Sequence, residues 1–199
     1  MKIRNKQIII DKVINELDRF VIDFINILKK HTDYVIVSGY VSILLGRTRT
    51  TEDIDILIPK IDFNVFKGLY EDILLSNFWC INANTSETIY NDYLDKETAV
   101  RFARKDEAVP NIELKFIKTN VDEITLGEAI EVKIGENILK TSPIEMQIAF
   151  KKNILGTPKD LEDARHLEKL FKDHLNIKKL QEYEQMLKPR KVVPKTKGF

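Results

Sequence analysis

The first part of the chain shows two successive patterns of apolar and polar positions. Over residues 10–28, apolar side chains recur every three or four positions, which is the spacing of one face of a helix. Residues 34–37 then form a short β-branched run, and the Ser-Gly pair at 38–39 forms a turn. Residues 40–45 can make a brief helix that ends at Gly46. The pattern predicts a long helix, a strand, a turn and a short helix.

The segment that follows changes to a period of two. Isoleucines alternate with other residues, as Ile54, Ile56 and Ile58 against Asp53, Asp55 and Leu57. Side chains two positions apart on a strand point to the same side, and Pro59 closes the strand. We therefore expect a strand with a buried isoleucine face and with both aspartates on the other face.

The middle of the chain is predicted to be rich in strands. Residues 62–77 have the pattern of a helix, and the polar stretch 82–98 is expected to be a loop or an irregular hairpin. Residues 112–116 alternate again and predict a second strand. A hairpin over residues 130–140, turning at Gly135, is expected to follow.

Helix-start signals occur twice in the last third of the chain. Ser-Pro-Ile-Glu at 142–145 combines an N-cap residue, a proline at the first helical position and a glutamate at the capping-box position. Thr-Pro-Lys-Asp at 157–160 repeats this arrangement with Asp in place of Glu. We predict helices over about 143–155, 158–173 and 176–188.

Composition describes a folded chain of 199 residues, with 43% hydrophobic and 32% charged residues. The longest apolar stretch is too short and too interrupted to cross a bilayer, and the N-terminus lacks the cleavage site of a signal peptide. A cytoplasmic protein without membrane contact is expected. Cys80 is the only cysteine, which excludes an internal disulfide. It is expected to be a core thiol.

Charge is distributed unevenly. The chain has 32 Lys and Arg, 31 Asp and Glu, and a net charge of +1. Four basic residues and no acid lie within the last eleven, so the remainder is at −3; the four are Arg190, Lys191, Lys195 and Lys197. A broad nucleic-acid-binding surface is therefore not indicated. The tail either contacts RNA or keeps the chain soluble.

The candidate chemistry lies on the two alternating strands. Asp53 and Asp55 place two carboxylates side by side, where they can share one divalent ion or bridge two. An oxygen-only site of this kind suits Mg²⁺ or Mn²⁺. Glu113 and Lys115 share one face of the later strand. If this strand lies beside the first, Glu113 is a third acid that holds metal or accepts a proton; otherwise it belongs to a solvated face.

A candidate anion site precedes the aspartates. Ser38 and Gly39 stand between a strand and a helix, where backbone N–H groups favour a triphosphate and a glycine permits close approach. Arg47 and Arg49 follow before the acidic strand. By itself a turn of this kind is usually only structural, so its value lies in the combination with the acids.

These motifs resemble a known family. Val-Ile-Val-Ser-Gly-Tyr at 35–40, followed by Thr-Glu-Asp-Ile-Asp-Ile-Leu-Ile at 51–58, resembles the signature of the DNA polymerase β-like nucleotidyltransferase superfamily. The stretch 142–171 is similar to the helical half of small prokaryotic nucleotidyltransferases that include abortive-infection (AbiEii-type) toxins. The resemblance covers roughly residues 33–60 and 110–172, and residues 61–109 contribute nothing to it.

The resemblance implies roles for further residues. A helix lysine, Lys151 or Lys152, is expected to contact the nucleotide phosphates, followed by a Lys-Asp-x-x-Asp segment that contains Asp160. The sequence departs from the family at Ser38, where a glycine is usual, and at Glu113, where an aspartate is commoner. A serine is tolerated at the turn if its backbone stays out of the left-handed conformation. Both departures leave room for a degenerate member.

Together these features predict an α/β (α+β) nucleotidyltransferase fold, with a mixed sheet flanked by helices. The expected divisions are an α/β core over 1–141, a helical segment over 142–188 and a basic tail over 189–199. The expected reaction moves NMP from an NTP, with ATP among the candidates, to a hydroxyl of tRNA, of a protein or of a small molecule. A toxin-like modifier would have a cognate antitoxin protein. The alternatives are an inactive nucleotide- or partner-binding module and a two-metal phosphohydrolase.

Overall fold

The computed structural model describes residues 1–4 and 7–188. It divides into two compact units, Met1–Pro143 and a second unit that begins at Ile144. The strands of the first unit are β1 (Lys2–Arg4), β2 (Gln7–Ile10), β3 (Val35–Ile36), β4 (Asp53–Ile58), β5 (Phe78–Cys80), β6 (Val100–Arg104), β7 (Asn111–Phe116), β8 (Ile130–Ile134) and β9 (Asn137–Thr141). The four strands that the sequence predicts from clear alternation or a hairpin signal, β4, β7, β8 and β9, are confirmed.

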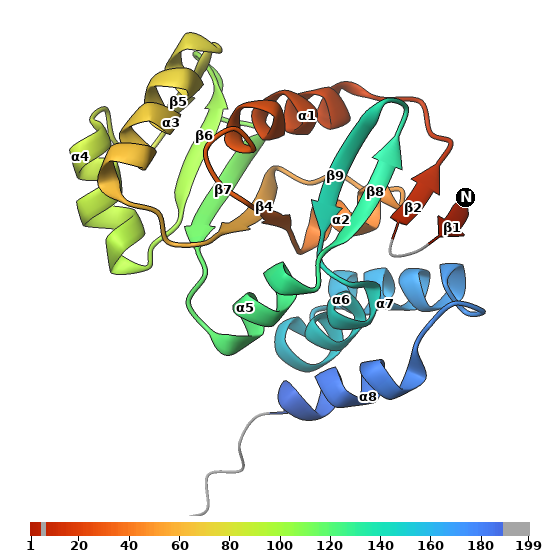
Figure 1. The fold of residues 1–199 in the computed structure, drawn as a ribbon. Coiled ribbons are helices and arrows are strands. Elements are labelled where there is room, and N and C mark those ends of the chain that lie inside the picture. The colour runs from red at the N-terminus through yellow and green to blue at the C-terminus, as the bar shows by residue number, and fades with distance from the viewer. Residues whose placement is uncertain (5–6, 189–199) are drawn as a thin grey trace, which may run out of the picture. The chain divides into compact units, whose positions relative to one another are not determined.

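All of these strands join one mixed sheet in the order β1-β2-β8-β9-β3-β4-β7-β6-β5 (Figure 1). The central strand β4 pairs with β3 in antiparallel orientation and with β7 in parallel orientation. Since several helical segments and two other strands separate β4 from β7 along the chain, only the folded sheet brings them together. The predicted mixed sheet is confirmed.

The helices of the first unit are α1 (Glu16–Leu28), α2 (Gly39–Leu44), α3 (Phe63–Leu75), α4 (Ser86–Thr88) and α5 (Asn120–Gly127). Short helical turns at Ile89–Tyr93 and Leu94–Lys96 continue α4. The prediction of a loop or hairpin over 82–98 is therefore wrong. The side chain of Thr85 caps α4 at the backbone N–H of Thr88, and three apolar residues of this segment, Ile89, Tyr90 and Leu94, are buried.

The first helix is shorter than the sequence pattern predicts. Residues 7–10 belong to β2, which pairs in parallel with β8, and α1 starts only at Glu16 behind a capping box formed by Asn15 and Asp18. Val13, which fits the helical spacing, is 90% exposed. Pairing with a strand more than 120 residues away overrides the local pattern, which no short-range signal shows.

The core lies between one face of the sheet and the helices α1 and α3. Ile54, Ile56 and Ile58 of β4 are fully buried, as predicted. Phe24 of α1 packs against Phe78 and Phe102 of the outer strands. Farther along, the ring of Tyr90 contacts rings on α3 and β7. The opposite face of the sheet carries Asp53 and Asp55 of β4, Arg101 of β6, and Glu113 and Lys115 of β7.

The second unit consists of helices. These are α6 (Ile144–Phe150), continued by a wider turn at Lys151–Leu155, then α7 (Pro158–Leu170) and α8 (Ile177–Met186). Thr157 caps α7 at the backbone N–H of Asp160, as its sequence signal predicts. All three predicted helices are confirmed. The predicted basic tail, 189–199, lies outside the described residues.

Two further sequence expectations concern single properties of the chain. Cys80 is buried in β5, as a core thiol should be. Within the described residues, no helix has both the length and the apolar character that a bilayer crossing needs.

Candidate metal and nucleotide site

The two aspartates of β4 lie on the face of the sheet opposite the buried isoleucines. Asp53 is exposed, whereas the side chain of Asp55 is 19% exposed. The hydroxyl of Thr51 donates to the backbone carbonyl of Asp53 at 3.0 Å and to its Oδ1 at 3.3 Å. This contact orients the first carboxylate at the start of the strand. The strand phase that the alternation predicts is confirmed.

The third acid comes from β7. In the parallel ladder, Glu113 stands directly opposite Asp55, and Asn111 stands opposite Asp53. One carboxylate oxygen from each of Asp53, Asp55 and Glu113 lies within 4.8 Å of the others. The condition that the sequence left open, that the two strands are neighbours, is therefore met, and the three acids form one cluster.

Two basic side chains neutralise part of this cluster. The ammonium of Lys115 lies 3.0 Å from Asp55 Oδ1 and 2.9 Å from Glu113 Oε2. The Nη2 of Arg101, on β6, lies 2.9 Å from Glu113 Oε1. Sequence reasoning placed Lys115 on the face of Glu113 without assigning it a role, and it missed Arg101 because β6 has no clear alternation.

These contacts shift the pKa values of the acids in opposite directions. Burial raises the pKa of Asp55, and the neighbouring carboxylate of Glu113 adds to this effect, while the charge and hydrogen bond of Lys115 oppose it. Burial also acts to raise the pKa of Glu113, but the hydrogen bond and charge of Lys115, together with Asp55 and Arg101, hold it below its usual value. The two neighbouring acids therefore differ in pKa, because Glu113 has the additional cationic partner Arg101.

The donor set fits a small divalent cation. All three ligand atoms are carboxylate oxygens, which Mg²⁺ and Mn²⁺ prefer. Two ligands of one Mg²⁺ lie at most about 4.2 Å apart, twice the bond length of roughly 2.1 Å. Since the oxygens lie within 4.8 Å of one another, small side-chain rotations would let them share one ion. An ammonium between two of them shows that the cluster already accommodates a cation.

The Ser-Gly turn lies beside the acidic strand. The backbone N–H of Val37 donates to the carbonyl of Asp55 at 3.0 Å, and the turn follows at once. Ser38 has φ 64° and ψ −134°, a backbone region that glycine visits far more readily than any other residue. The condition under which a serine would be tolerated at this turn, a backbone outside the left-handed region, is therefore not met. The site contains a strained residue where the resembled family has a glycine.

The two candidate arginines, Arg47 and Arg49, make different contacts. A Cβ on Gly39 would lie 2.5 Å from Nη2 of Arg49, so this guanidinium rests directly on the glycine. Arg49 also donates from Nη1 to the carbonyl of Thr50 at 3.0 Å. Arg47 is tied through its backbone N–H to the carbonyl of Ser42. Arg49 is thus the arginine that reaches the turn, and glycine is needed there for its close approach.

The C-terminal candidates lie in the second unit and have unequal surroundings. Lys151 is fully buried, and its ammonium lies 2.9 Å from Asp163 Oδ2 and 3.5 Å from Asp160 Oδ1. Lys152 is 34% exposed and pairs with Glu168. Asp160 also accepts a hydrogen bond from the hydroxyl of Thr157. The phosphate-binding roles of these residues stay predictions.

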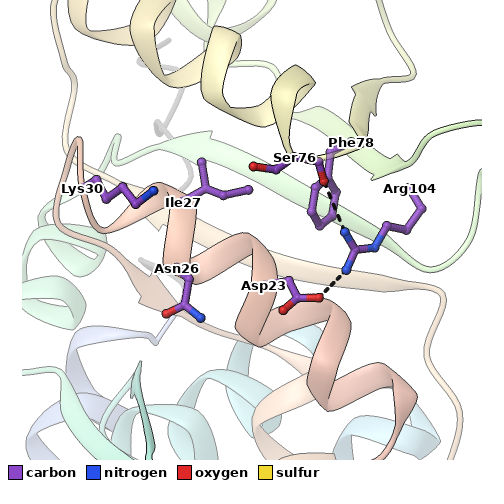
Figure 2. A pocket seen from close by; sticks show the side chains of 7 residues that line it. All are labelled: Asp23, Asn26, Ile27, Lys30, Ser76, Phe78 and Arg104. Carbon is purple, nitrogen blue, oxygen red and sulfur yellow. Dashed lines mark hydrogen bonds and ion pairs between the residues drawn. The ribbon is translucent and has the colours of Figure 1, made fainter.

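A separate pocket of about 330 Å³ lies near the edge of the sheet (Figure 2). Arg104 of β6 is one of its lining residues, paired with Asp23 of α1 and stacked over the ring of Phe78 at 4.2 Å. Arg104 and Arg101 are three positions apart on one strand and so point to opposite faces. The pocket therefore belongs to the helix-covered side and not to the carboxylate cluster.

Comparison with known proteins identifies the class of fold. The crystal structure of ANT(2")-Ia in complex with adenylyl-2"-tobramycin matches with a TM-score of 0.53 and 14% identity, over 85% of this chain and 95% of that one. The solution structure of the antibiotic-resistance factor ANT(2")-Ia matches with a TM-score of 0.50 and 14% identity, over 86% and 92%. An antigenic nucleotidyltransferase-like protein from Paracoccidioides brasiliensis also matches, at a TM-score of 0.49 and 17% identity, over 84% and 85%.

The chain therefore has a nucleotidyltransferase-like fold, similar to that of ANT(2")-Ia. No family model matches the chain. No curated protein matches it either. The finer resemblance to abortive-infection toxins stays a prediction.

Proposed function

We propose that this protein is a metal-dependent nucleotidyltransferase that moves a nucleoside monophosphate from an NTP to a hydroxyl and releases pyrophosphate. One observation carries the proposal: three carboxylates converge within 4.8 Å on the face of the sheet opposite the buried isoleucines, next to a Ser-Gly turn. The nucleotidyltransferase-like fold supports it.

Each candidate residue has a role in this proposal. Asp53 and Asp55 hold Mg²⁺, which would neutralise charge on the phosphates and align the reacting oxygens. The backbone N–H groups at Ser38 and Gly39, with Arg49 beside them, hold the triphosphate. From the second unit we assign phosphate binding to Lys152, because Lys151 is buried between two carboxylates. Arg47 and Asp160 support the turn and the helix start.

The reaction is an in-line displacement. The acceptor oxygen forms a bond to the α-phosphorus, the bond from this phosphorus to the bridging oxygen breaks, and pyrophosphate leaves with the electron pair. Glu113 either completes the metal site or takes the hydroxyl's proton. Its contacts with Lys115 and Arg101 favour the first role, because cationic partners make a carboxylate a weaker base; the proton then leaves to solvent.

The acceptor class is what the experiment must find. Family resemblance suggests tRNA or a protein, as expected for a toxin-like modifier with a cognate antitoxin. The complex of ANT(2")-Ia with adenylyl-2"-tobramycin shows an adenylylated small molecule on this fold. Small hydroxyl compounds are therefore the third class of acceptor to test. NTP is the common substrate in all three.

The test is label transfer from α-labelled NTPs, with Mg²⁺ and cell extract, by the wild type and Asp55→Ala. We expect a labelled acceptor with the wild type and a loss of about 1000-fold in the variant, since a lost metal ligand costs several kcal/mol of transition-state stabilisation. Asp62→Asn, at an exposed acid beyond β4, is the control and should transfer normally. Equal transfer by Asp55→Ala would refute the site, and release of labelled nucleotide without a labelled acceptor would indicate a phosphohydrolase.

An inactive nucleotide-binding module is the second candidate. The observation that favours it is the pairing of Asp55 and Glu113 with Lys115 and Arg101, which satisfies these acids without metal. Calorimetry separates the two functions. NTP binding that is independent of Mg²⁺, together with no label transfer, would establish the module and exclude the enzyme.

A further inference from the structure

Lys115 lies where the carboxylates of the cluster converge. Its ammonium contacts Asp55 Oδ1 at 3.0 Å and Glu113 Oε2 at 2.9 Å, so it bridges two different strands. Arg101 uses the other oxygen of Glu113, Oε1. The two oxygens that Lys115 holds belong to two of the three acids that lie within 4.8 Å of one another. A metal ion on Asp55 and Glu113 would compete for the same side chains.

The charges of the cluster explain why both cations cannot keep the same position. The three acids, when ionised, carry three negative charges, and Lys115 and Arg101 carry two positive ones. The cluster is therefore nearly neutral before any metal arrives. An ammonium and a divalent ion that share two ligands would stand only a few ångströms apart, where like charges repel strongly.

The lysine side chain is able to move away. It is 36% exposed, whereas the carboxylates that it contacts are 19% and 13% exposed. Four methylene groups carry the ammonium, so rotation about them turns it toward solvent without displacing the backbone. The strand that carries it is held by the parallel ladder to β4, so the acids stay in place.

We propose that Lys115 is a built-in counter-ion of the metal site, which holds Asp55 and Glu113 together without metal and leaves both when a divalent ion binds. This inference rests on the proposed metal site. Lys115 thereby lowers the affinity of the site for free metal. Once released, its ammonium stands at the edge of the site, where the phosphates of a bound NTP offer it new partners.

The first test measures Mn²⁺ binding by calorimetry or electron paramagnetic resonance for the wild type, Lys115→Met and Asp55→Asn. We expect Lys115→Met to bind Mn²⁺ at least about tenfold more tightly, because a positive charge within a few ångströms is removed. The matched control is Lys140→Met, since Lys140 is also a strand lysine paired with one carboxylate, that of Asp33, away from the cluster. Its affinity should equal that of the wild type.

The outcomes separate the two proposals. If the wild type binds Mn²⁺, Asp55→Asn does not, and Lys115→Met binds no tighter than the wild type, the counter-ion role is overturned and the metal site stands. If neither the wild type nor Lys115→Met binds Mn²⁺, the metal site itself is refuted, and the counter-ion role with it.

A second test needs no variant and so does not depend on Lys115→Met folding. Wild-type protein is acetylated briefly with and without Mn²⁺, and the modification of each lysine is measured by mass spectrometry. We expect acetylation of Lys115 to rise severalfold with Mn²⁺, because the ammonium leaves its carboxylates, while Lys140 serves as the internal reference and stays constant. Unchanged or reduced acetylation of Lys115 at saturating Mn²⁺ would overturn the proposal.

Discussion

This protein contains two clusters in which one lysine contacts two carboxylates, in different surroundings. In the second unit, Lys151 lies between Asp163 and Asp160, and the side chains are 0%, 0% and 7% exposed. On the sheet, Lys115 lies between Asp55 and Glu113, and the side chains are 36%, 19% and 13% exposed. The distances in the two clusters are similar, so the difference is one of access.

Access decides what such a cluster can do. A fully buried lysine can only stay paired, because loss of either partner leaves an uncompensated charge away from water. A partly exposed lysine can give up its carboxylates to another cation and be solvated. The site cluster also lies beside a strained serine, Ser38, whereas the buried cluster is joined to a helix cap at Thr157. We conclude that one cluster maintains a fold and the other is suited to exchange.

The largest effect is expected in the buried cluster. Lys151→Met should lower the free energy of unfolding by about 3–5 kcal/mol, since it leaves two acids without their cation. Urea unfolding followed by circular dichroism measures this. Lys152→Met is the matched control, because its 34% exposed side chain pairs with a surface acid and should cost at most about 1 kcal/mol. Equal losses of unfolding free energy in the two variants would show that burial of Lys151 does not make its ion pairs more important for stability than those of Lys152.

A divalent metal ion should stabilise the folded protein only by binding to the site cluster, the carboxylates around Lys115. At a concentration of about 100 times its Kd, Mn²⁺ is expected to raise the free energy of unfolding by about 2.7 kcal/mol, because it binds the folded state alone. Asp55→Asn should show no such increase, whereas Asp163→Asn should retain it if it still folds. Thermal unfolding with Mn²⁺ and with a chelator checks both. A wild type that gains nothing from Mn²⁺ would contradict the exchange of cations.

The strained backbone at Ser38 predicts a smaller effect, an increase in the free energy of unfolding when the strain is removed. Ser38→Gly should stabilise the protein by roughly 1 kcal/mol, because relief of a strained backbone is partly offset by the greater freedom of glycine in the unfolded chain. Asn77→Gly is a useful comparison, since Asn77 also has a positive φ, 62°, but asparagine tolerates this region better than serine. Urea unfolding compares the variants, and a destabilised Ser38→Gly would show that the serine side chain is needed there.

The smallest effect is expected for the lysine of the site itself. Without metal, Lys115→Met should lower the free energy of unfolding by less than about 1 kcal/mol, because its ion pairs are partly solvated. The measurement is urea unfolding in the presence of a chelator. A loss of unfolding free energy as large as that of Lys151→Met would mean that both clusters stabilise the fold to the same extent.

The local structure that follows from neighbouring residues was predicted correctly. A period of two places Asp53 and Asp55 on one face, and caps such as Thr157 mark helix starts. Prediction failed where a distant partner decides the structure. The isoleucines of β2 join a strand beside β8, and Arg101 meets Glu113 only because β6 pairs with β7. Neither pairing leaves a signal within a few residues.

The amino-acid sequence by itself determined which side chains share a face and where helices begin, because strand period and capping depend on neighbours along the chain. Only the tertiary structure decided that Glu113 completes the pair of aspartates and that Lys115 lies between two of the acids. It also decided that Lys151 is buried while Lys152 is not. Burial and the pairing of distant strands are properties of the whole packed unit, so two adjacent lysines of one helix can differ completely.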